Sequence, residues 1–224
     1  MTPSGGDFDV VTGAFSYSGA AIASELRAVG RRVRTLTGHP GRAPEGTSIE
    51  VRPLDFADPA GLAASLRGAR ALFNTYWVRF AHGQVSHETA VAQSRVLFQA
   101  AAEAGVSRVV HVSITHPSAD SPYPYFRGKA AVEQALRDLR LSHAVLRPAI
   151  LFGGNGVLIN NIAWLLRRLQ FVGDDRSGVA ERPGHDVEVA SHRPSWIEST
   201  SVVRTWPSGA SRVAVAYVSP RVGP

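Results

Sequence analysis

Short apolar runs alternate with longer segments of helical spacing along the first 170 residues of the chain. The runs predict strands at 8–12, 32–37, 48–54, 71–76, 108–113 and 142–146. Segments with apolar residues three or four positions apart predict helices at 20–29, 59–68, 86–104, 125–139 and 157–169. Strands separated by helices of this length are typical of βαβ units, so the sequence predicts an α/β fold: a doubly wound, mostly parallel sheet with helices on both faces.

Residues that favour helix ends stand where the pattern begins or ends a helix. Asp58 precedes Pro59, which matches the preference for Asp at the N-cap and for Pro at the first helical position. Gly30 and Gly105 follow two of the expected helices, and glycine commonly ends a helix. Between them, the Gly- and Pro-rich segment 38–46 predicts a loop.

The pattern changes after residue 170. Residues 1–170 contain 16 leucines and residues 171–224 contain none, while Arg, Ser and Pro stay frequent. Only 211–218 reads as a strand. We therefore expect one folded domain over 1–170 and a poorly packed or flexible segment over 171–224. A frame change in a GC-rich gene and a genuine polar tail explain this segment equally well.

Composition narrows the class of protein. The 224 residues are 44% hydrophobic, which is enough for a core, and no stretch approaches the ~18 apolar residues of a membrane span. There is no cysteine and no signal-peptide pattern, so we expect a cytoplasmic protein without a disulfide or a thiolate metal site. The net charge of +6 comes from scattered basic residues, which argues against nucleic-acid binding. All 24 basic residues except Lys129 are arginine.

The first expected strand runs into the turn TGAFSYSG. A dinucleotide site needs a tight turn after this strand, close backbone approach and a helix N-terminus aimed at the phosphates. Gly13 fits the turn and Gly19 fits close packing of the helix, while Ser16 replaces the middle glycine of the usual pattern. Serine is small and its hydroxyl can donate to a phosphate. We favour a cofactor site here over an ordinary strand–helix turn.

The segment after the second expected strand selects the nucleotide. An acid at this place binds the ribose of NAD, and a base accepts the 2′-phosphate of NADP. This chain has no acid there and offers Thr37, His39 and Arg42, which favours NADP and leaves NAD possible. A loop in which Arg42 contacts only solvent is the alternative. Asp55, after the third strand, is placed either to reach the adenine or to form a turn.

A second group of residues suits proton transfer. Tyr125 and Lys129 are four positions apart on an expected helix, so they share a face. A nearby cation favours the tyrosinate and lowers the tyrosine pKa, and lysine also reaches ribose hydroxyls. Ser113 ends the fifth expected strand, at the edge where such sheets bind ligands. The alternative is a packed tyrosine with a solvated lysine.

Together these residues resemble the short-chain dehydrogenase/reductase superfamily, most closely its extended and atypical branches. These branches include NAD-dependent epimerase/dehydratase-like proteins, NmrA-like proteins and the nucleotide-binding accessory subunit of respiratory complex I. The resemblance covers about residues 8–170 and rests on VTGAFSYSG, LDFAD, FNTYWVRF, HVS, YFRGK and VLRPAILFG. It implies a Rossmann-type NAD(P)-binding domain.

The resemblance also implies roles for single residues. Ser113, Tyr125 and Lys129 take the places of the catalytic serine, tyrosine and lysine. The phosphate loop would contain Gly13, Ser16, Tyr17 and Gly19, the cofactor cleft would be lined by Asn74, Thr75 and Tyr76, and Pro148 to Phe152 would lie beside the nicotinamide. FNTYWVRF replaces the small-residue turn usual after the fourth strand, and its bulk is expected to narrow the cleft.

Two functions follow as hypotheses. The first is an oxidoreductase or epimerase-like enzyme acting on a small carbonyl or hydroxyl substrate, with Tyr125 as general acid/base. The second is a non-catalytic NAD(P)-binding sensor or assembly subunit, as in the NmrA-like and complex I relatives. Both give the chain a nicotinamide dinucleotide as partner, and neither specifies the substrate or the oligomeric state.

Overall fold

The computed structural model describes residues 7–78, 86–139, 141–148, 151, 161 and 218–219. A seven-stranded sheet forms the centre of the described part of the chain. Its strands are β1 (Phe8–Thr12), β2 (Arg32–Thr37), β3 (Glu50–Pro53), β4 (Ala69–Asn74), β5 (Arg108–Val112), β6 (His143–Leu146) and β7 (Val218–Ser219). The helices are α1 (Tyr17–Ala28), the 3₁₀ turn η1 (Pro40–Arg42), α2 (Pro59–Leu66), α3 (His87–Glu103) and α4 (Pro124–Asp138).

The order of the strands places a crevice beside β1. The sheet runs β3-β2-β1-β4-β5-β6-β7, so the chain moves outward from β1 to β3 and then returns to the other side of β1 as β4. The strands β1 to β6 are all parallel to their neighbours, and β7 pairs antiparallel with β6. In such sheets ligands bind outside the carboxyl ends of the strands, where the strand order reverses. Here that point lies between β1 and β4.

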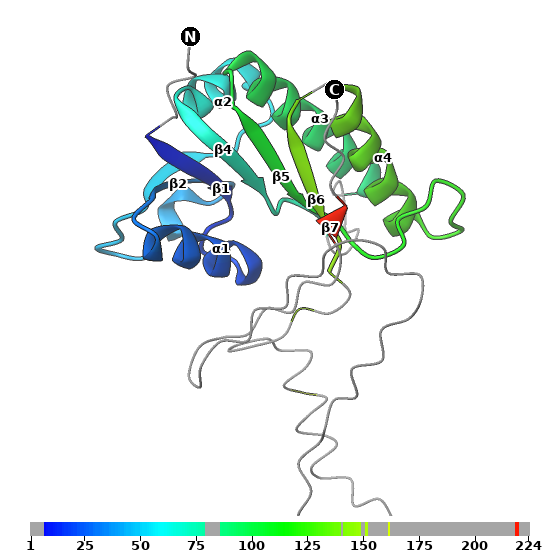
Figure 1. Ribbon diagram of the computed structural model, residues 1–224, viewed down its shortest axis with the longest axis horizontal. Coiled ribbons are helices and arrows are strands. Elements are labelled where there is room, and N and C mark those ends of the chain that lie inside the picture. The colour runs from blue at the N-terminus through cyan, green and yellow to red at the C-terminus, as the bar shows by residue number, and fades with distance from the viewer. Residues whose placement is uncertain are drawn as a thin grey trace, which may run out of the picture.

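Helices cover both faces of the sheet, as the sequence predicts. Figure 1 shows α1 on one face and α2, α3 and α4 on the other. Alternate strand residues point to opposite faces, so Val10 packs with the larger core beneath α2–α4 and Val11 packs with the smaller core beneath α1. Phe98 of α3 and Leu136 of α4 are fully buried in the larger core. Apolar packing on both faces therefore holds the carboxyl edges of the strands in fixed register.

The predicted elements are confirmed with shifts at their ends. The strand at 8–12 and the strand at 32–37 have the predicted bounds, and Asp58 caps α2 by accepting from the Gly61 amide at 2.9 Å. The helix α1 starts at Tyr17 instead of residue 20, because small residues close to the turn allow the helix to begin earlier. The strand β4 ends at Asn74, two residues before the predicted end, since the Thr75 and Tyr76 amides bond to a side chain of β1.

Several expectations fall outside the described residues. They include the helix at 157–169, apart from residue 161, and the character of 171–224, apart from β7. The last predicted strand, 211–218, is described only at its end, where β7 runs against the parallel direction of the sheet. Among the described residues, no helix has the length and apolar character to cross a bilayer, and no cluster of side chains is suited to hold a metal ion.

Candidate functional site

The turn between β1 and α1 is tight and lies directly against the start of the helix. Gly13 has φ +63°, a conformation that side chains disfavour, and its amide donates to the Leu36 carbonyl of β2 at 2.8 Å. A Cβ atom on Gly19 would lie 2.0 Å from the Gly13 carbonyl oxygen, so α1 packs directly on the turn. Ser16 is the N-cap of α1 and its hydroxyl makes no capping bond. The positive end of the helix therefore points to the sheet edge with its first amides lacking helical partners.

Thr12, which sequence reasoning missed, fixes this turn to β4. Its hydroxyl accepts from the Thr75 amide at 2.7 Å and from the Tyr76 amide at 3.1 Å. It donates to the Asn74 side-chain oxygen at 3.2 Å, and the Thr75 hydroxyl returns a bond to the Thr12 carbonyl at 2.6 Å. This cross-strand network determines the separation of β1 and β4 at the point where the strand order reverses. A threonine at a strand end is too common to stand out in a sequence.

The predicted cleft residues Asn74, Thr75 and Tyr76 have different surroundings. Asn74 is fully buried, and its amide pairs with His111 Nδ1 at 3.1 Å, so its side chain supports the edge from within the sheet. Thr75 is half-buried at the edge itself. The Tyr76 hydroxyl donates to Gln93 of α3, and burial raises the pKa of this tyrosine. The side chain of Asn74 is thus not exposed to a ligand.

The residues predicted to choose the nucleotide lie on the loop after β2. His39 and Arg42 are exposed, and the Thr37 hydroxyl accepts from the His39 amide at 3.2 Å, which shapes the start of the loop. Asp55 is exposed after β3 and accepts from the Ala57 amide at 2.9 Å, as a turn aspartate does. Its second oxygen makes no hydrogen bond among those found in the described part of the chain.

An aromatic cluster surrounds Tyr125 in the first turn of α4. The Tyr125 ring meets Trp77 edge-on at 5.8 Å and His87 edge-on at 5.5 Å, and Trp77 and His87 stack at 5.7 Å. Gly128 makes room for this cluster, because a Cβ there would lie 2.8 Å from the Trp77 ring. Trp77 belongs to the bulky FNTYWVRF segment, and its ring does fill space beside Tyr125. No sequence pattern distinguishes His87 as a site residue.

Lys129 is buried beside Trp77. Its side chain is only 3% exposed, its Nζ donates to the Val112 carbonyl of β5 at 3.2 Å, and it lies 4.4 Å from the centre of the Trp77 ring. Burial lowers the pKa of Lys129 to about 7, and the charge of Glu133 opposes this shift. The predicted alternative of a solvated lysine is therefore wrong. The charged amine has two further N–H donors besides the one that bonds Val112.

Ser113 directly follows Val112 and completes the predicted set at the carboxyl edge of β5. Its amide donates to the Leu146 carbonyl of β6 at 2.7 Å, and its hydroxyl is buried without a hydrogen-bond partner of ordinary geometry among the described residues. Pro148, predicted to border the nicotinamide, is buried just beyond β6. The fold therefore brings Ser113, Lys129 and the end of β6 to the edge that also carries the β1 turn.

A hollow lies at the amino edge of the sheet, on the opposite side from this site. It is lined by Phe8, Arg27, Gly30, Arg31, Arg32, Val33, Arg34, Ser48 and Glu50. Two of its four arginines serve the fold, since Arg31 pairs with the buried Asp9 at 2.8 Å and Arg34 pairs with Glu50 at 2.9 Å. The strand ends that bind ligands in parallel sheets are on the other side.

Solved structures with this fold include proteins that hold a nicotinamide dinucleotide. One is a short-chain dehydrogenase/reductase superfamily protein from Agrobacterium tumefaciens with bound NAD (23% identity, 62% of this chain and 48% of that chain, TM-score 0.50). Another is the Citrobacter sp. triphenylmethane reductase complexed with NADP(H) (22% identity, 64% of this chain and 50% of that chain, TM-score 0.53). A third is the UDP-N-acetylglucosamine 4-epimerase from Bacillus cereus (23% identity, 65% of this chain and 54% of that chain, TM-score 0.53). The chain spans about half the length of these proteins.

These similarities confirm the fold that the sequence resemblance implies. No curated protein matches the chain by sequence. The sequence model of a family described as NAD(P)H-binding matches residues 13–162, which is more than half of the chain and begins at the first glycine of the β1 turn. The chain therefore belongs to this NAD(P)H-binding family, and its cofactor is a nicotinamide dinucleotide.

Proposed function

We propose that the chain binds NADP at the β1–α1 turn and takes part in hydride transfer to or from a small carbonyl or hydroxyl substrate. The observation that carries the proposal is that Lys129 bonds the Val112 carbonyl, next to Ser113 at the carboxyl end of β5, while the Lys129 amine and the Tyr125 ring both contact Trp77. The substrate and the reaction are proposals for the whole protein, since the chain spans only about half of the structures that it resembles.

The residues at the turn fit a dinucleotide. Gly13 holds a positive φ that brings the backbone close to a ligand, and a Cβ there would lie 3.2 Å from the Ser16 hydroxyl. Ser16 and the first amides of α1 would hold the pyrophosphate, and Thr75 at the end of β4 would border it. When bound, the nicotinamide supplies the hydride or accepts it.

Tyr125 is the proposed general acid/base. Its ring is held edge-on by Trp77 and His87, so the hydroxyl has a restricted direction. A charged Lys129 on the same face of α4 would favour the tyrosinate, and its pKa of about 7 means that the charge is partly lost at neutral pH. The Ser113 hydroxyl, which has no ordinary hydrogen bond in the described part of the chain, would donate to the substrate oxygen.

The preference for NADP rests on the loop after β2. His39 and Arg42 are exposed there, and the loop from 38 to 43 has no carboxylate that would repel a 2′-phosphate. Arginine recognises phosphate by a planar pair of donors, which a ribose hydroxyl does not need. The loop would therefore distinguish the two nucleotides through charge.

The oxidation of NADPH by a panel of small aldehydes and ketones tests the proposed activity. We expect oxidation with at least one carbonyl class, and we expect Tyr125→Phe to abolish it while the nucleotide still binds, because the ring can pack without its hydroxyl. Binding of NADPH without oxidation by any carbonyl would contradict the enzyme and favour a sensor. Full activity of the Phe variant would exclude Tyr125 as the acid.

A further inference from the structure

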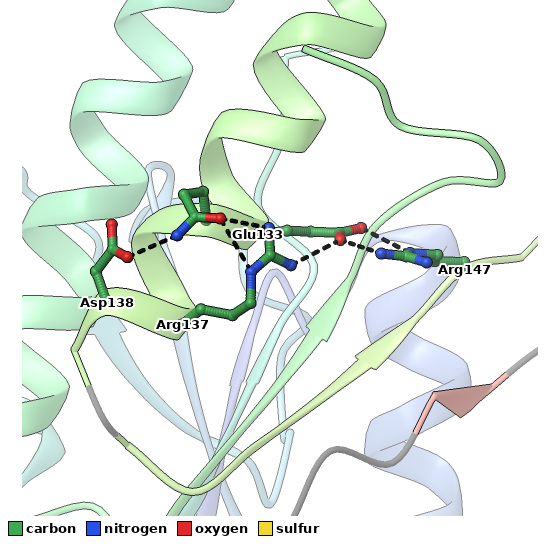
Figure 2. Close-up of polar contacts among 5 residues, drawn as sticks. Glu133, Arg137, Asp138 and Arg147 are labelled. Carbon is green, nitrogen blue, oxygen red and sulfur yellow. Dashed lines mark hydrogen bonds and ion pairs between the residues drawn. The ribbon is translucent and has the colours of Figure 1, made fainter. Parts of the chain in front are cut away.

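Glu133 is a buried acid on α4 that the proposed function does not use. Its side chain is 1% exposed. Figure 2 shows its carboxylate between the guanidinium groups of Arg147 and Arg137. Arg147, just beyond β6, donates to it from Nε at 3.0 Å and also from its terminal nitrogen, whereas Arg137 lies farther away at 3.5 Å. The ion pair between Glu133 and Arg147 therefore joins α4 to the end of β6.

Glu133 lies one helical turn after Lys129 on the same side of α4. Positions four apart on a helix are neighbours. The other groups facing the Lys129 amine are the Val112 carbonyl, the face of Trp77 and the buried His111. Burial and the charge of Lys129 hold the pKa of His111 well below its ordinary range, so His111 is neutral and adds no opposing charge. Glu133 is the carboxylate whose charge favours a charged Lys129.

The Glu133 carboxylate also interacts with Ser113. Burial alone would raise the pKa of Glu133, but the hydrogen bonds from Arg147 and the charges of Arg147 and Arg137 outweigh it, so the acid stays ionised. The Ser113 hydroxyl also lowers this pKa, although it makes no hydrogen bond of ordinary geometry in the described part of the chain. Glu133 is therefore in electrostatic contact with Ser113 after β5, Lys129 on α4 and Arg147 after β6. Two of these three residues belong to the proposed catalytic set, and they come from different elements.

We propose that Glu133 is a positioning residue: its buried carboxylate favours the charged form of the Lys129 amine and holds α4 against the end of β6. The catalytic role of Lys129 rests on the proposed function, but the interaction of Glu133 with Lys129 does not. Arg147 keeps Glu133 ionised and in place, since a buried carboxylate without such a partner would be neutralised. The charge on Lys129 thus depends on the ion pair between Glu133 and Arg147.

Lys129 is the sole lysine of the chain, so its titration can be followed directly. The full chain, labelled with ¹³C- and ¹⁵N-lysine, gives one side-chain NMR signal, and no nucleotide is added. We expect a midpoint near pH 7 for the wild-type protein. Glu133→Gln, which keeps the shape and removes the charge, should lower the midpoint by about one pH unit. Arg147→Gln should lower it as well, because without the guanidinium group the buried Glu133 carboxylate would be neutralised.

Arg137→Gln is the matched control on α4, since Arg137 is 40% exposed and lies 3.5 Å from the carboxylate. It should shift the midpoint less than either other variant. A merely structural role for Glu133 predicts the opposite sign, because loosened packing admits water and raises the lysine midpoint in every variant. An unchanged or raised midpoint in Glu133→Gln overturns the proposal.

If Glu133→Gln does not fold, Arg147→Gln decides the question. A lowered midpoint in Arg147→Gln supports the proposal, and an unchanged or raised one overturns it. Because these titrations use the free protein, they remain informative if hydride transfer is never found. Conversely, hydride transfer with an unchanged midpoint in Glu133→Gln would leave the proposed function standing and remove Glu133 from it.

Discussion

Gly19 of α1 lies so close to Gly13 that a Cβ atom on it would be 2.0 Å from the Gly13 carbonyl oxygen. This contact presses the helix onto the turn and aims the helix N-terminus at the sheet edge. Since real Cβ atoms do not approach an oxygen so closely, any side chain at this position must displace the helix or the turn. The approach of the two glycines is the structural basis of the proposed nucleotide site.

We expect Gly19→Ala to destabilise the protein and to weaken nucleotide binding. The loss of unfolding free energy should be about 1–3 kcal/mol, the usual cost of overpacking a close contact. Thermal and urea unfolding measure the first effect and calorimetric titration with NADPH measures the second. Gly41→Ala is the control for stability, because nothing lies within 4 Å of the added Cβ. Equal stability of both variants would show that the contact is not tight in solution.

Arg42→Ala should separate the two nucleotides. If Arg42 binds the 2′-phosphate, the variant should lose about 1–3 kcal/mol of NADPH affinity, the size of a charged hydrogen bond, while NADH affinity stays nearly constant. Parallel titrations with the two nucleotides measure the difference. Losses of equal size would mean that Arg42 does not distinguish them, and the preference for NADP would lack its main support.

Lys129→Met should change how stability depends on pH. Lys129 has a pKa of about 7 in the folded chain against an ordinary value of 10.5, so between these values the unfolded chain holds a proton that the folded chain has released. The contribution of Lys129 to the free energy of unfolding therefore rises with pH across that window, by at most about 1.4 kcal/mol per pH unit. Below pH 7 the full cost of burying the charged amine remains.

The methionine variant keeps the apolar stem and removes the charge. We expect it to gain most in stability relative to wild type at or below pH 7, with the difference shrinking steadily toward pH 10. Urea unfolding of both proteins at matched pH values measures this difference. A difference that does not vary with pH would mean that Lys129 titrates as an ordinary exposed lysine, contrary to its 3% exposure.

The sequence was sufficient for the parallel sheet because each strand and helix is marked locally. The run Phe8–Thr12 and the pair Asp58-Pro59 carry their structure in their own residue types. The direction of β7 could not be predicted, because antiparallel pairing with β6 depends on contacts far apart in the chain. End positions were also less certain, since β4 stops where its next amides find the Thr12 hydroxyl instead of a neighbouring strand.

The features of the candidate site that depend on residue spacing could be predicted from the sequence, whereas those that depend on side-chain burial could not. Tyr125 and Lys129 were recognised by their separation, but burial of the Lys129 amine against Trp77 was not visible in the sequence. Glu133 could have been noticed as the acid one turn beyond the lone lysine. Its bonds to Arg147 join residues 14 positions apart, and only the folded chain brings them together.

Calorimetric titration of Gly13→Asp with NADPH tests the nucleotide site most directly. Aspartate tolerates a positive φ better than most residues, and nothing lies within 3.0 Å of the added Cβ, so the variant should fold. Its carboxylate would repel the pyrophosphate at the turn. Ser24→Asp adds the same charge to an exposed position of α1 and serves as the control. We expect NADPH binding to be lost in Gly13→Asp and kept in Ser24→Asp, whereas unchanged NADPH affinity in a folded Gly13→Asp protein would contradict the site.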